Sequence, residues 1–282
     1  MWGGQPLPFT NGNARIIRAS LHPRQIGIKC MFRKTDEQEY QHQRAALERE
    51  LAVWCRLDNP RILPLSGTIM LSNDLNPNIY ISPSAVFDYY EHGDITMFIR
   101  SSHRPDGKHR LRLLCEVAGG LSYLHDEGII HGDIKSANVL IDSSKAARIC
   151  DFGSAYIPQC SNCIAGTPSR FDSLRTELYL SPELWMDWEE DLPSPTTQAS
   201  DVQTGIPPYK PENGRNWTHS LTKRQRGELP AQREAFSTNG PISTATGEIA
   251  FECWILEAQD RPSAQDVFEM LNEACHLFQA HL

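Results

Sequence analysis

Residues 131–153, HGDIKSANVLIDSSKAARICDFG, contain two short polar clusters separated by two apolar runs. The polar clusters are HGDIKSAN and DFG, and the apolar runs are residues 139–141 and the strand-like residues 147–150. Two short apolar runs joined by polar residues predict a β-hairpin. Such a hairpin returns the second cluster to the side of the first, so the stretch predicts a single polar site built on loops.

The two clusters together resemble the catalytic loop and the metal-binding turn of protein kinases. HGDIKxxN followed about a dozen residues later by DFG is a specific combination, whereas either half alone is a weak signal. Kinases of this family need a carboxylate near the substrate hydroxyl, oxygen ligands for Mg²⁺ and a cation near the transferred phosphoryl group. The resemblance implies Asp133 as the catalytic base and Lys135 as the cation on the γ-phosphate. It implies Asn138 and Asp151 as the metal ligands.

The length of the chain fits this resemblance. A chain of 282 residues is long enough for roughly two structural units of about 150 residues each. The resemblance implies one α+β, bilobal protein kinase domain with a small β-rich N-lobe over residues 1–88 and a larger, mainly helical C-lobe over residues 89–282. It extends from about residue 14 to residue 275.

Charge and cysteine usage restrict the partners that we expect. The chain has 27 Lys and Arg against 35 Asp and Glu, a net charge of -8, so it offers no basic field that would attract nucleic acid. Its eight cysteines follow no disulfide framework, and no apolar leader or membrane span is evident. We therefore expect a soluble, cytoplasmic protein, and the sequence does not indicate its oligomeric state. A lone Cys160-x-x-Cys163 without a second ligand pair does not favour a zinc site.

The N-terminal segment matches the family only in part. Kinases place a glycine-rich hairpin over the ATP phosphates, because a backbone without Cβ atoms can approach them closely. If Ile16 takes the position of the valine that follows these glycines, the three glycine positions become Phe9, Asn11 and Ala14, with Gly12 out of register. A plain first strand and a working phosphate clamp both remain open.

Lys29 and Glu50 are predicted to form an ion pair. Residues 25–29 resemble the third kinase strand, whose lysine contacts the α and β phosphates, and Gly27 stands where alanine is usual. Residues 36–57 have a helical pattern with one apolar face, formed by Leu47, Leu51, Trp54 and Leu57. Glu50 falls within the same arc, and a carboxylate aimed inward is costly unless it meets a cation. Lys29 is the predicted partner, because the family that the chain resembles pairs these two positions.

The adenine pocket is expected on both sides of the interlobe hinge. Residues 57–68 resemble the turn and the fourth strand that follow the helix, and residues 80–88 predict a strand that leads into the hinge. By resemblance, Phe87 is the gatekeeper at the back of the pocket, and residues 88–90 offer backbone groups to the adenine edge. The cofactor-binding residues that the resemblance implies are Ile16, Gly27, Lys29, Phe87, Asp88, Tyr90 and Leu140.

The C-terminal part carries a second specific signal. Residues 176–183, TELYLSPE, match the T-x-x-Y-x-A-P-E pattern of serine/threonine kinases, and C-W-x(6)-R-P follows at residues 253–262. The resemblance implies Thr176 at the catalytic site and Arg261 as the partner of Glu183. Helices are predicted over residues 110–125, 246–256 and 263–278. Gly132 replaces the arginine that ordinarily reads an activating phosphate.

One departure from the family is large. After Val202 the family continues with an apolar helix, whereas this chain goes directly to a TGIPPY turn. Roughly ten to twelve residues, about three helical turns, are absent. We expect the gap to lower stability and to leave Asp201 on an unanchored turn that no longer supports His131 and Asp133.

The motifs together most resemble the tyrosine-kinase-like group of serine/threonine kinases, in a fungal style. The leading interpretation is an ATP- and Mg²⁺-dependent protein serine/threonine kinase with Lys29, Glu50, Asp133, Lys135, Asn138 and Asp151 in the roles above. The alternative is a weak or inactive pseudokinase that serves as a binding or scaffold module. The complete set of catalytic polar residues favours the enzyme, whereas the eroded glycine loop and the missing helix favour the scaffold.

Overall fold

The structure is a computed structural model, and it describes residues 6–11, 14–31, 37–70, 83–101, 105–158, 181, 197–202 and 241–279 of the chain. The predictions that concern Thr176, Cys160, Cys163 and Glu183 lie outside these residues, as does the chain directly after Val202. Within the described part, no helix is long and apolar enough to cross a membrane.

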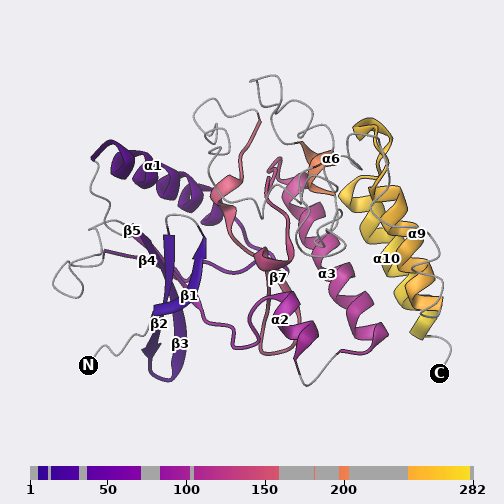
Figure 1. The fold of residues 1–282 in the computed structure, drawn as a ribbon, viewed down its shortest axis with the longest axis horizontal. Helices are drawn as coiled ribbons and strands as arrows, with labels where there is room; N and C mark the ends of the chain where they lie inside the picture. The colour runs from indigo at the N-terminus through magenta and orange to yellow at the C-terminus, as the bar shows by residue number, and fades with distance from the viewer. Residues whose placement is uncertain are drawn as a thin grey trace, which may run out of the picture.

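The N-terminal part is an antiparallel sheet of five strands in the order β1-β2-β3-β5-β4 (Figure 1). Alternating apolar residues and tight connections favour strands here. The strands are β1 Pro6–Asn11, β2 Ala14–Leu21, β3 Arg24–Met31, β4 Gly67–Met70 and β5 Pro83–Asp88. The β1–β2 pair forms the hairpin at the position of the family's glycine-rich loop, although its residues depart from the glycine pattern.

Helix α1, Glu37–Trp54, lies beside the sheet and begins and ends close to the bounds predicted from its apolar period. Its inward face is formed by Leu47, Leu51, Val53 and Trp54, all buried. The Trp54 indole Nε1 donates a hydrogen bond to the Leu63 carbonyl oxygen at 2.6 Å. This bond fixes the end of the helix to the segment that follows it.

The C-terminal part is mainly helical, as Figure 1 shows, with α3, α9 and α10 side by side. Its α-helices are α2 Ile95–Arg100, α3 Gly107–Asp126, α6 Gln198–Asp201, α9 Pro241–Cys253 and α10 Ala264–Gln279. Three 3₁₀ turns in the described ranges are η1 Ser136–Asn138, η2 Phe152–Ser154 and η3 Ala258–Asp260. The sheet at one end and the helices at the other confirm the predicted α+β class.

The predicted hairpin is present between these two parts. Its strands are β6 Val139–Ile141 and β7 Ala147–Ile149, paired antiparallel with Val139 opposite Ile149. One continuous hydrophobic core joins α1, β5, α3, β7, α9 and α10. The hairpin is therefore embedded between the sheet and the helices, and polar residues at its open end are held by both.

Candidate active site

The β6–β7 hairpin brings the two polar clusters together. The Cys150 backbone N–H, just after β7, donates to the Asn138 carbonyl oxygen, just before β6, at 2.9 Å. His131 is buried, and its Nε2 lies 3.1 Å from the Cys150 carbonyl oxygen. The predicted juxtaposition is confirmed, and it is produced by local β-pairing.

Asp133 lies in the first cluster, and its two carboxylate oxygens have different surroundings. Its Oδ2 accepts from Lys135 Nζ at 2.5 Å and from Asn138 Nδ2 at 3.0 Å. Its Oδ1 is buried and has no hydrogen-bond partner among the described residues. Burial raises the pKa of Asp133, although the Lys135 ammonium group opposes this. Oδ1 is thus a buried acceptor that could take a proton from a hydroxyl group.

The predicted Lys29–Glu50 pair is formed, and Asp151 joins it. Lys29 Nζ lies 2.7 Å from Glu50 Oε1 and 2.7 Å from Asp151 Oδ1. The side chains of Lys29, Glu50 and Asp151 are only 12%, 5% and 20% exposed. These contacts connect β3, α1 and the turn after β7, so a single lysine joins the sheet to the hairpin.

Burial and the neighbouring charges shift the pKa values of Lys29 and Glu50. Burial disfavours the Lys29 ammonium group, but the Asp151 and Glu50 carboxylates outweigh it and hold the pKa of Lys29 above its usual value. Burial raises the pKa of Glu50, with the Lys29 charge acting in the opposite direction. Two carboxylates share one cation here, which leaves negative charge in a partly dry site.

Asn138 and Asp151 offer oxygen atoms that fit a hard divalent cation. Asn138 Oδ1 is buried and has no hydrogen-bond partner in the described part of the chain. No group of three or more His, Cys, Asp or Glu side chains that could hold a metal was found among the described residues. A carboxylate plus an amide oxygen is nevertheless sufficient for a cation that keeps waters and takes phosphate oxygens as further ligands.

Asp201 anchors the loop that carries the first polar cluster. Its carboxylate accepts from the backbone N–H groups of His131 at 2.7 Å and Gly132 at 2.8 Å, and it contacts His125 Nε2 at 3.2 Å. The expectation of an unanchored Asp201 is therefore wrong. There are two reasons: a capping box between Thr197 and Ser200 caps the N-terminus of α6, and a side chain far along the sequence holds this turn from outside.

Arg261 supplies that outer support. Its guanidinium group donates to the carbonyl oxygens of Ala199 at 3.2 Å, Ile255 at 2.6 Å and Leu256 at 2.9 Å. The short helix α6 is thus fixed to the turn before α10 even though the chain after Val202 departs from the family.

Asp201→Ala is expected to lower the free energy of unfolding by about 2–6 kcal/mol, because a buried N–H that loses its acceptor costs about 1–3 kcal/mol and two such groups are affected. Urea denaturation measures this loss. Asp126→Ala, which removes an exposed carboxylate at the end of α3, is the control and should unfold at the wild-type midpoint. Equal midpoints for both variants would contradict the anchoring role.

Gly132, in the first polar cluster, has a conformational role. Its φ is +76°, in the left-handed region where a Cβ is unfavourable. This conformation directs its N–H to Asp201. The sequence did not indicate this role, which depends on the backbone conformation of the folded chain.

The residues predicted for the adenine pocket lie on the sheet, on the hairpin and on the segment that joins them. Gly27 on β3 is directly opposite Phe87 on β5, and the partly buried Ile16, Tyr90 and Leu140 pack against the main core. Asp88 ends β5. Their roles toward a nucleotide stay predictions.

The contacts of two further side chains were not predicted from the sequence. Trp54 packs at a tilted angle near Phe87, with ring centroids 5.7 Å apart, and near Phe152 at 6.0 Å. Its spacing of four residues from Glu50 was the available signal, because residues four apart share a helix face. Arg61 was also missed: it packs over Phe268 at 5.1 Å and fills the space left by Gly119 on α3.

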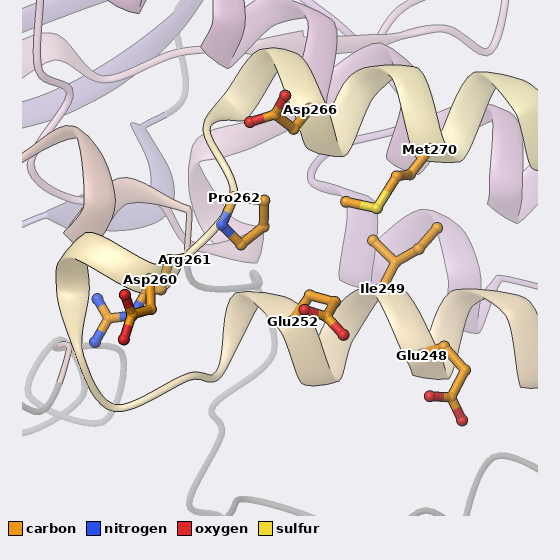
Figure 2. Close-up of a pocket in the computed structure, with 8 residues that line it drawn as sticks. All are labelled: Glu248, Ile249, Glu252, Asp260, Arg261, Pro262, Asp266 and Met270. Carbon is orange, nitrogen blue, oxygen red and sulfur yellow. The ribbon is translucent and has the colours of Figure 1, made fainter.

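A separate pocket of about 470 Å³ lies between α9 and α10 (Figure 2). Its lining is formed by Glu248, Ile249, Glu252, Asp260, Arg261, Pro262, Asp266 and Met270. None of the residues predicted to act in catalysis, nucleotide binding or metal binding lines it. The pocket is therefore distinct from the polar cluster described above.

Comparison with known proteins gives a family match and several relatives. The family model described as "Protein kinase domain" matches residues 10–271. The receptor-interacting serine/threonine-protein kinase 3 of Rattus norvegicus is 29% identical over 245 residues, which are 83% of this chain and 49% of the relative. The serine/threonine-protein kinase CTR1 of Arabidopsis thaliana is 26% identical over 276 residues, 91% of this chain and 29% of the relative. The chain thus spans half or less of the length of these curated relatives.

Proposed function

This chain belongs to the protein kinase family, and we propose that it is an ATP-dependent serine/threonine kinase that transfers the γ-phosphoryl group to protein hydroxyls. The observation that carries the proposal is the assembly of Lys29, Glu50 and Asp151 together with Asp133, whose Oδ1 accepts no hydrogen bond from the described residues. The polar groups that phosphoryl transfer needs are present in one partly buried cluster. Protein substrate and ATP are the proposed partners.

Asp133 and Lys135 act on the reacting groups in this proposal. Asp133 Oδ1 orients the substrate hydroxyl and accepts its proton, since the other oxygen is held by Lys135 and Asn138. Lys135, already beside Asp133, neutralises charge on the transferred phosphoryl group. Thr176, outside the described residues, would border the same site and restrict it to an alcohol.

Lys29 and the metal ligands act on the phosphates. Lys29, oriented by Glu50 at 2.7 Å, binds the α and β phosphates. Asn138 Oδ1 and Asp151 would hold Mg²⁺, which when bound neutralises phosphate charge. The excess carboxylate charge around Lys29 suits such a cation.

The nucleotide base lies between two proposed lobes, residues 1–88 and 89–282. Phe87 forms its back wall, and Asp88 and Tyr90 present backbone groups to its edge. Ile16 and Gly27 cover it from the sheet, and Leu140 supports it from the hairpin. These residues lie on β2, β3, β5 and β6 and on the segment after β5, so the site depends on both lobes.

A non-catalytic scaffold remains the second interpretation, and the glycine positions at Phe9, Asn11 and Ala14 are its main support. The formed β1–β2 hairpin and the assembled polar cluster favour the enzyme instead. A scaffold needs neither an available base oxygen nor an oriented lysine.

Calorimetry with ATP, with and without Mg²⁺, followed by phosphotransfer to a peptide library, tests the proposal. We expect Mg²⁺-dependent binding and phosphoserine or phosphothreonine as products. The Asp133→Asn protein, prepared in parallel, excludes a contaminating kinase. No binding at millimolar ATP with Mg²⁺ would overturn the enzyme assignment, and phosphotyrosine as the main product would overturn the hydroxyl class.

A further inference from the structure

Gly27 and Phe87 face each other on neighbouring strands. They are direct partners in the antiparallel pairing of β3 and β5, and directly opposed residues in such a pair point to the same face of the sheet. Lys29, two residues along β3, also points to this face, because side chains alternate along a strand. Residue 27 and Phe87 therefore lie on the same face of the sheet as the lysine that pairs with Glu50.

The Phe87 ring occupies the volume in which a side chain at position 27 would begin. A Cβ built on Gly27 would overlap Phe87 Cε2 and would lie 2.6 Å from Cζ and 3.1 Å from Cδ2. These separations are far below normal carbon contact at two ring atoms, so alanine at position 27 and the present ring position are incompatible. The edge of the Phe87 ring occupies the space that the methyl group of an alanine at position 27 would fill.

The ring has little freedom to retreat from β3. Phe87 is only 4% exposed, and its centroid is 5.7 Å from that of Trp54. Trp54 is itself 2% exposed and is held by its hydrogen bond to Leu63. Displacing the ring would require the end of α1 to move, one turn after Glu50.

We propose that Gly27 and Phe87 form a matched pair that determines the shape of the nucleotide pocket, with the Phe87 ring edge replacing the methyl group of an alanine. The proposal rests on the proposed function, because it assigns the adenine-facing surface of that site. It makes Gly27 a residue that shapes the pocket, although it has no side chain. Only a smaller residue at position 87 makes room for a larger one at position 27.

The test is a double-substitution cycle of Gly27→Ala, Phe87→Leu and the combined variant. Gly27→Ala should weaken Mg²⁺-ATP binding about tenfold, as expected for overpacking of a well-filled site. Leucine lacks atoms at the Cε2 and Cζ positions, so the combined variant should recover most of this loss. Gly107→Ala is the matched control, because its new Cβ meets Ile242 Cδ1 at an ordinary 3.4 Å.

Urea denaturation of the nucleotide-free proteins gives a second readout. Gly27→Ala should lower the urea midpoint when Phe87 is present. Added to Phe87→Leu, it should leave the midpoint of that single variant unchanged. In the binding assay, Gly107→Ala should bind Mg²⁺-ATP as the wild type does. Additive effects in both assays would overturn the matched pair while leaving the proposed function intact. A wild-type protein that binds no nucleotide would overturn the proposed function and the nucleotide part of this inference, and the denaturation cycle would still decide the packing part.

Discussion

Asp133→Asn is expected to lower kcat by about 10²–10⁴-fold, the usual contribution of a positioned general base. Asparagine can keep its carbonyl oxygen toward Lys135 and Asn138 and present an amide group where Oδ1 stands, and an amide accepts no proton. The free energy of unfolding and the KM for ATP should change little, because neither the loop geometry nor the phosphate contacts are removed. Steady-state kinetics with a serine peptide measures the effect. A kcat within tenfold of the wild-type value would remove Asp133 from the base role.

The pH dependence of kcat distinguishes a catalytic base at Asp133 from a carboxylate with only a structural role. The base acts in its ionised form, so kcat should fall as pH falls through the pKa of Asp133. Burial raises that pKa above the ordinary aspartate value of 3.8, so the acid limb of the profile should lie at higher pH than the titration of an exposed aspartate. The Asp133→Asn protein should lack this limb at its lower rate.

The second large effect is expected for Asp151→Asn, which removes a charged metal ligand. Mg²⁺-dependent ATP binding should weaken by more than about a hundredfold, since loss of even a supporting residue costs about 10–100-fold in metal affinity. Calorimetry at several Mg²⁺ concentrations is the measurement. The expected signature is not only weak binding but the disappearance of its dependence on Mg²⁺.

Glu50→Gln is the matched comparison. It also removes one carboxylate from Lys29, at the same 2.7 Å separation, but it leaves Asn138 and Asp151 unchanged. ATP binding should weaken while its Mg²⁺ dependence persists. If both variants retain that dependence equally, Asp151 does not hold the metal.

Local patterns predicted the parts of the site that neighbouring residues build. The hairpin between Asn138 and Asp151 follows from two apolar runs and a polar turn, because antiparallel pairing of adjacent segments needs few long-range contacts. The Lys29–Glu50 pair was predictable for a different reason: a carboxylate on the buried face of a helix requires a cation, and the resemblance to kinases indicated Lys29. Element boundaries were less certain, and α9 begins at Pro241 rather than at residue 246.

Contacts between distant segments could not be predicted in the same way. Asp201 reaches His131 across 70 positions of sequence, and its support by Arg261 depends on how α6 meets the turn before α10. The sequence suggested that the gap after Val202 would free Asp201, because a missing helix removes packing. The structure shows instead that the Arg261 guanidinium group, which donates to the Ala199 carbonyl oxygen, holds α6 in place.

The sequence by itself determined the family, the α+β class and the polar residues of the candidate site, since these follow from motif spacing, period and the cost of burying charge. Tertiary structure alone decided how closely side chains approach. The overlap of a Gly27 Cβ with the Phe87 ring, the left-handed Gly132 and the different surroundings of the two Asp133 oxygens each depend on ångström-scale placement of segments in the folded chain. Close packing makes such placements sensitive to a single methyl group, and no pattern along the sequence records them.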